Sequence, residues 1–217
     1  MNFDKPLDGW FTYLAWNIDL QLRGPFVKAS TRREHYQEHL VHIAEELRKE
    51  GAVTAHALEV TMVVPVDGGP RYDVALLVHA GDEVRDELVR RTSALGFPTP
   101  ELATVARNAG RFGDTEGQEG EILLNHFAGD AVPQAAVEAW ASISEWYART
   151  LGVDNSTLLE FTEDTPILIM NYAVLPGKAI PFLAGQVLRP SFYSVVRKQL
   201  HEAGIAPFPL IARRLDG

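Results

Sequence analysis

Apolar and polar positions predict one order of elements in the first half of the chain. Aromatic and β-branched runs are typical of strands, and apolar residues spaced by three and four are typical of helices. Leu40, Ile43 and Leu47 follow the helical spacing, with Ser30 or Thr31 as a capping residue. The predicted elements are a strand at 10–20, a helix at 31–50, a hairpin of strands at 56–66 and 72–80, a helix at 82–95 and a strand at 102–107.

The second half repeats this order. Its predicted elements are a strand at 121–128, a helix at 133–151, a hairpin of strands at 156–162 and 167–174, a helix at 191–203 and a strand at 208–213. Asn17 matches Asn125, and residues 58–61 (LEVT) match residues 159–162 (LEFT). Glycines and polar residues between the halves favour an exposed connection. We therefore predict a first ferredoxin-like repeat at 1–110, a connector at 111–120 and a second repeat at 121–217.

Each βαββαβ repeat implies a four-stranded antiparallel sheet with both helices on one face. The strands are apolar at nearly every position, whereas a sheet with one solvated face alternates. Both faces should therefore be buried. The predicted fold class is α+β: two tandem ferredoxin-like repeats whose antiparallel sheets pack face to face as an α+β barrel around a small-molecule pocket.

On this element order, over residues 10–215, the chain resembles the dimeric α+β barrel superfamily in its tandem form. That superfamily includes the antibiotic-biosynthesis monooxygenases, the EthD-like proteins and the haem-containing chlorite dismutases. The predicted apolar pocket suits an apolar or aromatic metabolite. The resemblance carries no family-specific catalytic motif, so it concerns the fold.

The composition argues against several classes of partner and chemistry. The 217 residues are 46% hydrophobic and 23% charged, as in ordinary globular proteins, and the net charge of −9 argues against a nucleic-acid partner. No apolar run is long enough to span a bilayer and the N-terminus does not resemble a signal peptide, so we expect a cytoplasmic protein without a membrane partner. With no cysteine, chemistry must come from other side chains or a cofactor.

Polar residues within apolar strands are candidates for the pocket, because a buried polar group needs a partner. Asn17, Asn125 and Asn171 are predicted to bind a ligand, together with Trp16 beside the first of them. The alternative is that each amide satisfies a neighbouring backbone group.

Ionisable residues on the strands of the second half are the candidates for acid–base catalysis. We predict catalytic roles for His126, Glu160 and Tyr172. For Glu160 and its counterpart Glu59, the alternative is an exposed edge-strand position that discourages aggregation. For His126, the alternative is a hydrogen-bonded structural histidine.

No metal site is predicted. His35, His39 and His42 share one helix flank, but they lack a nearby carboxylate pattern and are expected to face solvent. The apolar segment at 175–190 is long for a connection and is expected to cover the pocket mouth, to form an oligomer contact or simply to pack.

Three functions remain open. The first is an enzyme without a cofactor, either a monooxygenase or a cyclase or isomerase, acting on a small organic molecule. The second is a haem protein with His201 or His126 as the axial ligand. The third is a non-catalytic binding or assembly module. Strand edges favour a homodimer.

Overall fold

The chain folds into two compact units. The computed structural model describes residues 2–130, 132–162 and 165–215. The N-terminal unit comprises the described residues of Asp8–Arg107 and Leu210–Gly217, and the C-terminal unit those of Met1–Leu7 and Asn108–Pro209. Two long strands, β6 (Leu102–Phe112) and β10 (Ile205–Arg214), contribute residues to both units.

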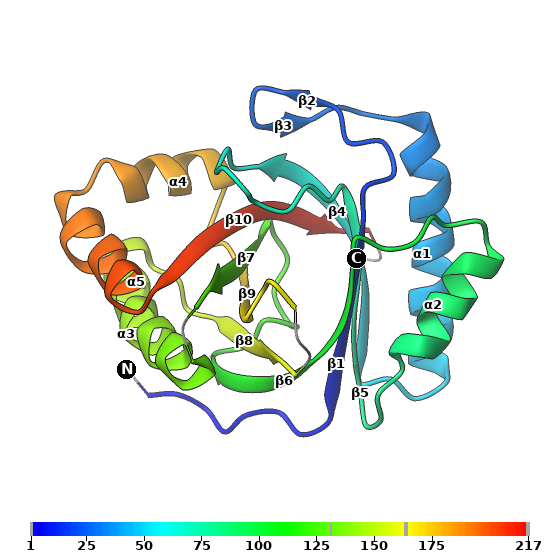
Figure 1. The fold of residues 1–217 in the computed structure, drawn as a ribbon, viewed down its shortest axis with the longest axis horizontal. Coiled ribbons are helices and arrows are strands. Elements are labelled where there is room, and N and C mark those ends of the chain that lie inside the picture. The colour runs from blue at the N-terminus through cyan, green and yellow to red at the C-terminus, as the bar shows by residue number, and fades with distance from the viewer. Residues whose placement is uncertain (1, 131, 163–164, 216–217) are drawn as a thin grey trace. The chain divides into compact units, whose positions relative to one another are not determined.

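The N-terminal unit places two helices on antiparallel strands (Figure 1). Besides the first part of β6 and the last part of β10, its elements are β1 (Trp10–Trp16), β2 (Leu22–Arg23), β3 (Phe26–Val27), α1 (Thr31–Lys49), β4 (Thr54–Val63), β5 (Val74–Ala80) and α2 (Arg85–Ala94). The predicted cap of α1 is confirmed, because the Ser30 hydroxyl accepts a hydrogen bond from Arg33 N at 3.3 Å.

The C-terminal unit has the same kinds of element. Besides its parts of β6 and β10, these are β7 (Ile122–Gly129), α3 (Pro133–Leu151), β8 (Ser156–Phe161), β9 (Ile169–Val174), α4 (Ala179–Val187), the π-helix η1 (Phe192–Arg197) and α5 (Lys198–Glu202). The α3 helix has the predicted bounds, beginning at Pro133 and ending before Gly152, which adopts the left-handed conformation (φ 72°). The α+β class is therefore confirmed.

Strand order is the same in the two units. The neighbours run β6-β1-β5-β4 in the N-terminal unit and β10-β7-β9-β8 in the C-terminal unit. The strands β4 and β8, which come last in these two orders, each have a further neighbour on the other side. The β4 strand pairs with the last part of β10, and β8 lies beside β6. These two edges are therefore not free to pair between subunits, which removes the reason for expecting a homodimer through them.

Strand β1 is buried on both of its faces, as its apolar sequence predicted. Every residue from Phe11 to Trp16 is buried. Leu14 and Trp16 pack with Leu40 of α1 and Leu88 of α2 in the core of the N-terminal unit. The apolar residues of this strand are thus buried irrespective of the side to which they point.

Besides the short strands β2 and β3, which were not predicted, the structure differs from the prediction in three segments. The β6 strand continues to Phe112, where a connector was expected, and its residues alternate between buried and partly exposed positions. The segment at 175–190, to which no helix or strand was assigned, contains α4. The last predicted helix begins as the π-helix η1 and continues as α5.

Candidate functional site

The C-terminal unit contains a cavity of about 80 Å³ between its strands and its helices. Leu123, Asn125 and Phe127 line it from β7, and Asn171 and Ala173 line it from β9. These residues alternate along each strand, so they point to one face. The pocket was predicted between two bare sheet faces. This cavity lies instead on the face that the helices cover.

Aromatic and aliphatic side chains make up most of the cavity wall. The aromatic members are Phe112, Phe127, Trp140, Tyr147, Phe182 and Phe192. The α4 helix supplies Phe182, Leu183 and Gln186. Part of the segment at 175–190 therefore lines a cavity, which is nearest to the first of the three alternatives given for it. The π-helix η1 supplies Phe192 and Val196. π-Helical turns are rare and frequently occur at functional sites.

Two asparagines lie side by side on the cavity wall. Asn125 and Asn171 are directly paired in the antiparallel register of β7 and β9. The oxygen Oδ1 of Asn171 accepts hydrogen bonds from Trp140 Nε1 at 2.7 Å and from the Ser156 hydroxyl. Oδ1 of Asn125 is buried and has no hydrogen-bond partner among the described residues. An unpaired buried carbonyl costs about 1–3 kcal/mol, which a ligand that donates to it would offset.

Trp140 is held tightly in this wall. A Cβ atom added to Gly110 of β6 would lie 2.7 Å from the indole carbon Cζ3, so the ring occupies the space that only glycine leaves open. The rings of Phe3 and Phe112 lie 5.3 Å and 6.2 Å from it, centroid to centroid. The indole N–H is thereby fixed towards Asn171.

The cavity wall carries no charge among the residues that the structure describes. Its polar members are three amides and three hydroxyl groups: Asn125, Asn171, Gln186, Ser144, Tyr147 and Ser156. The Tyr147 hydroxyl donates to Oε1 of Gln186 at 2.9 Å, and burial raises the pKa of Tyr147 well above its ordinary value. At neutral pH the wall is therefore polar at a few points and uncharged.

The three residues predicted to be catalytic do not line this cavity. His126 lies between Asn125 and Phe127 on β7, and strand alternation turns its side chain to the opposite face. Tyr172 is separated from the cavity in the same way, between Asn171 and Ala173 on β9, and half-buried Glu160 pairs with Ile169 in the register of β8 and β9. Burial lowers the pKa of His126 from 6.5 to about 4, so it is neutral at pH 7.

Of the four predicted ligand-binding residues, only Asn125 and Asn171 line the cavity. Trp16 belongs to the N-terminal unit, where it is buried in the core and donates its indole N–H to Pro98 O at 3.1 Å. Asn17 follows it, and its Oδ1 accepts a hydrogen bond from Leu20 N at 3.2 Å. The local backbone contact weighed as the alternative is therefore present at Asn17.

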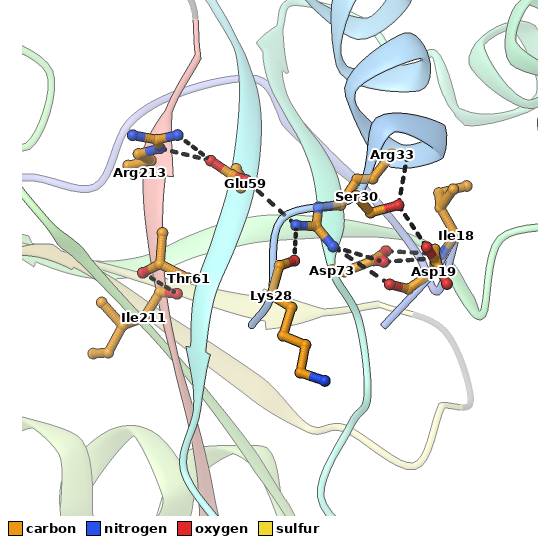
Figure 2. Close-up of polar contacts among 10 residues, drawn as sticks. All are labelled: Ile18, Asp19, Lys28, Ser30, Arg33, Glu59, Thr61, Asp73, Ile211 and Arg213. Carbon is orange, nitrogen blue, oxygen red and sulfur yellow. Dashed lines mark hydrogen bonds and ion pairs between the residues drawn. The ribbon is translucent and has the colours of Figure 1, made fainter. Parts of the chain in front are cut away.

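Glu59 lies in an ion-paired cluster of the N-terminal unit (Figure 2). Its carboxylate accepts from Arg213 Nε at 2.6 Å and lies 3.7 Å from Arg33 Nη2. The Arg33 guanidinium is also 3.6 Å from Asp73, which is fully buried and accepts from Ile18 N at 2.8 Å. Glu59 thus faces two cations, and the strand that carries it, β4, is paired with β10 at this residue.

The three histidines on one flank of α1, His35, His39 and His42, do not form a metal site with other described residues. His35 and His42 are exposed and His39 is half-buried on α1. Among the described residues, no group of three or more His, Cys, Asp or Glu side chains is arranged to hold a metal ion.

The cavity also contains residues that were not predicted from the sequence: Trp140, Ser156, Tyr147 and the α4 residues. Trp140 follows the helical spacing of α3 and is indistinguishable in sequence from a core residue. The sequence signal for the α4 residues was the unusual length and apolar character of the segment at 175–190, in which no helix was predicted.

No protein-family model matches the chain, and no curated protein matches it either. Solved structures do. A haem-binding protein from Thermus thermophilus is 12% identical (98% of this chain and 93% of the other covered, TM-score 0.55). A proposed monooxygenase from Fusobacterium nucleatum is 7% identical (95% and 91%, 0.55). A mutant chlorite dismutase from Candidatus Nitrospira defluvii is 12% identical (95% and 92%, 0.54).

These proteins share its fold. At such identities the likeness concerns the fold and does not extend to a ligand or a reaction. Among the described residues, no helix is long and apolar enough to cross a membrane.

Proposed function

We propose that the cavity of the C-terminal unit binds a small, uncharged and largely aromatic organic molecule. The observation that carries the proposal is the Oδ1 atom of Asn125, buried without a partner among the described residues beside a cavity walled by six aromatic rings. Pockets for small organic ligands combine such apolar walls with a few polar groups that fix orientation. The absence of charge from the described wall favours a neutral ligand, since a buried charge needs a partner.

The wall supports binding better than acid–base catalysis. General acid–base catalysis of a cyclisation or an isomerisation needs a group that accepts or donates a proton near neutral pH. The only ionisable side chain among the described lining residues is Tyr147, and burial raises its pKa away from neutrality. We therefore propose a binding function and assign no reaction, whether oxygenation, cyclisation or isomerisation.

The lining residues do not fit a haem. Axial ligands to haem iron are His, Cys, Met or Tyr side chains. Of these types, only Tyr147 occurs among the described lining residues, and its hydroxyl is engaged with Gln186. His126 points to the other sheet face, and His201 is exposed on α5. The proposed binding therefore involves no haem.

We also propose that the two halves are copies of one ferredoxin-like βαββαβ unit. The shared element order and the shared neighbour order of strands (fourth, first, third, second) support this. The two copies would correspond to the predicted repeats at 1–110 and 121–217. Among the described residues, only the second copy has a third helical segment, α4, which walls the cavity.

A matched pair of α3 variants tests the binding proposal, with naphthalene as the probe. Ser144 lines the cavity, whereas Ser142 is exposed on the same helix. Ser144→Leu should fill the cavity and weaken naphthalene binding by tenfold or more, measured by isothermal titration calorimetry, while Ser142→Leu should leave the affinity unchanged. Undetectable binding to the wild type, or equal losses in both variants, would overturn the proposal.

A further inference from the structure

The hydrogen bonds around Asn171 fix the orientation of its side-chain amide. Trp140 Nε1 lies 2.7 Å from one amide atom, and the Ser156 hydroxyl donates to the same atom. An indole N–H can only donate, so the atom that it contacts is the carbonyl oxygen Oδ1. The amide nitrogen must therefore occupy the other position.

The indole that sets this orientation has little freedom to move. Gly110 and the rings of Phe3 and Phe112 enclose Trp140, as described above. Ser156 is buried on β8, next to the strand that carries Asn171. The two donors thus come from a helix, α3, and from β8, the strand next to the one that carries the amide.

The NH₂ group of Asn171 is left for a ligand. No described residue accepts a hydrogen bond from it, although Asn171 lines the cavity. Its cross-strand neighbour Asn125 is close enough in register to compete, yet Oδ1 of Asn125 has no partner among the described residues. The two amides therefore present separate polar points on one apolar wall.

We infer that Asn171 selects ligands that carry a hydrogen-bond acceptor, such as the carbonyl oxygen of an aromatic ketone, and that Trp140 and Ser156 are the residues that position it. This inference rests on the proposed function, since it names the ligand group that the same cavity recognises. Asn125, which no described donor holds, can turn either its oxygen or its nitrogen towards the ligand. The specificity for an acceptor therefore lies with Asn171.

The affinity ratio for two matched probes tests the inference. 1-Tetralone and tetralin have the same fused rings, but only the ketone carries an acceptor. The wild type should bind 1-tetralone about fivefold more tightly than tetralin, as expected for one net hydrogen bond. Calorimetric titration of both probes gives the ratio, which cancels changes that affect both ligands alike.

Variants separate positioning from packing. Trp140→Phe keeps an aromatic ring but removes the donor, so the ratio should fall towards one while tetralin still binds. Asn171→Leu should remove the preference, and the matched variant Asn125→Leu should retain it. Should Asn171→Leu fail to fold, the wild-type and Trp140→Phe ratios still decide.

The outcomes also separate this inference from the binding proposal. If neither probe binds the wild type, the proposed function itself fails. If both bind with equal affinity, the cavity binds ligands but Asn171 does not select them. A preference that survives in Asn171→Leu and disappears in Asn125→Leu would assign the selection to the other amide and overturn the inference.

Discussion

The buried imidazole of His126 should make the stability of the protein depend on pH. It is fully buried on β7, and burial lowers its pKa from 6.5 to about 4. The folded state therefore favours the neutral ring, whereas the unfolded chain takes up a proton near pH 6.5. The free energy of unfolding should be constant above about pH 7 and should fall as the pH decreases from 6.5 towards 4.

The magnitude follows from the two pKa values. At about 1.4 kcal/mol for each pH unit, the full loss below pH 4 is about 3 kcal/mol. Between pH 7.5 and pH 5 the same relation gives a loss of about 2 kcal/mol. Asp19 and Asp154, whose pKa values are lowered by side-chain hydrogen bonds, stay ionised at pH 5 and contribute little in this range.

Urea unfolding followed by circular dichroism at pH 7.5 and pH 5 measures this loss. His126→Gln removes the titrating group and should reduce the loss by about 2 kcal/mol. His201→Gln is the control, because His201 is exposed on α5 of the same unit, and it should show the full wild-type loss. If His126→Gln loses as much stability as the wild type, the ring is not held neutral and the placement of His126 is wrong.

Two further predictions concern packing. Arg33→Met should lower the free energy of unfolding by about 3–5 kcal/mol, because it leaves the buried carboxylate of Asp73 without its cation. Arg91→Met removes a partly exposed cation that pairs with Glu50 and Glu87, and it should cost less than about 1 kcal/mol. Equal losses in urea unfolding would contradict the burial of the ion-paired cluster in Figure 2. Gly110→Ala should displace Trp140, changing the near-ultraviolet circular dichroism and weakening naphthalene binding several-fold, while Gly177→Ala, where an added Cβ meets no atom within 4 Å, should do neither.

Elements with strong local signals were predictable from the sequence. The α3 helix was predicted with its observed bounds because Pro133 suits a first helical turn and Gly152 suits a left-handed end. The α4 helix was missed because Pro181 and Gly185 lie within it, and both residues are more typical of turns. Pro181 is tolerated in the first turn, where its missing N–H would have no partner within the helix.

The candidate site was predictable in part. Asn125 and Asn171 were selected as polar residues in apolar strands, and both line the cavity. Strand alternation alone could have separated Asn125 from His126, because neighbours on a strand point to opposite faces. The contacts of Trp140 and Ser156 with Asn171 join residues that are distant in sequence, and only the fold brings them together.

The most direct test of ligand binding in this cavity is a nuclear magnetic resonance titration of the ¹⁵N-labelled protein with 1-tetralone. The side-chain amide signals of Asn125 and Asn171 would be assigned by their loss in Asn125→Leu and Asn171→Leu. Both pairs of signals should shift on titration, and Asn171 should show nuclear Overhauser contacts to the ligand, while the side-chain amide signals of Asn17 in the N-terminal unit should not shift. Unchanged signals from both cavity asparagines at saturating ligand, or shifts confined to the N-terminal unit, would contradict ligand binding in this cavity.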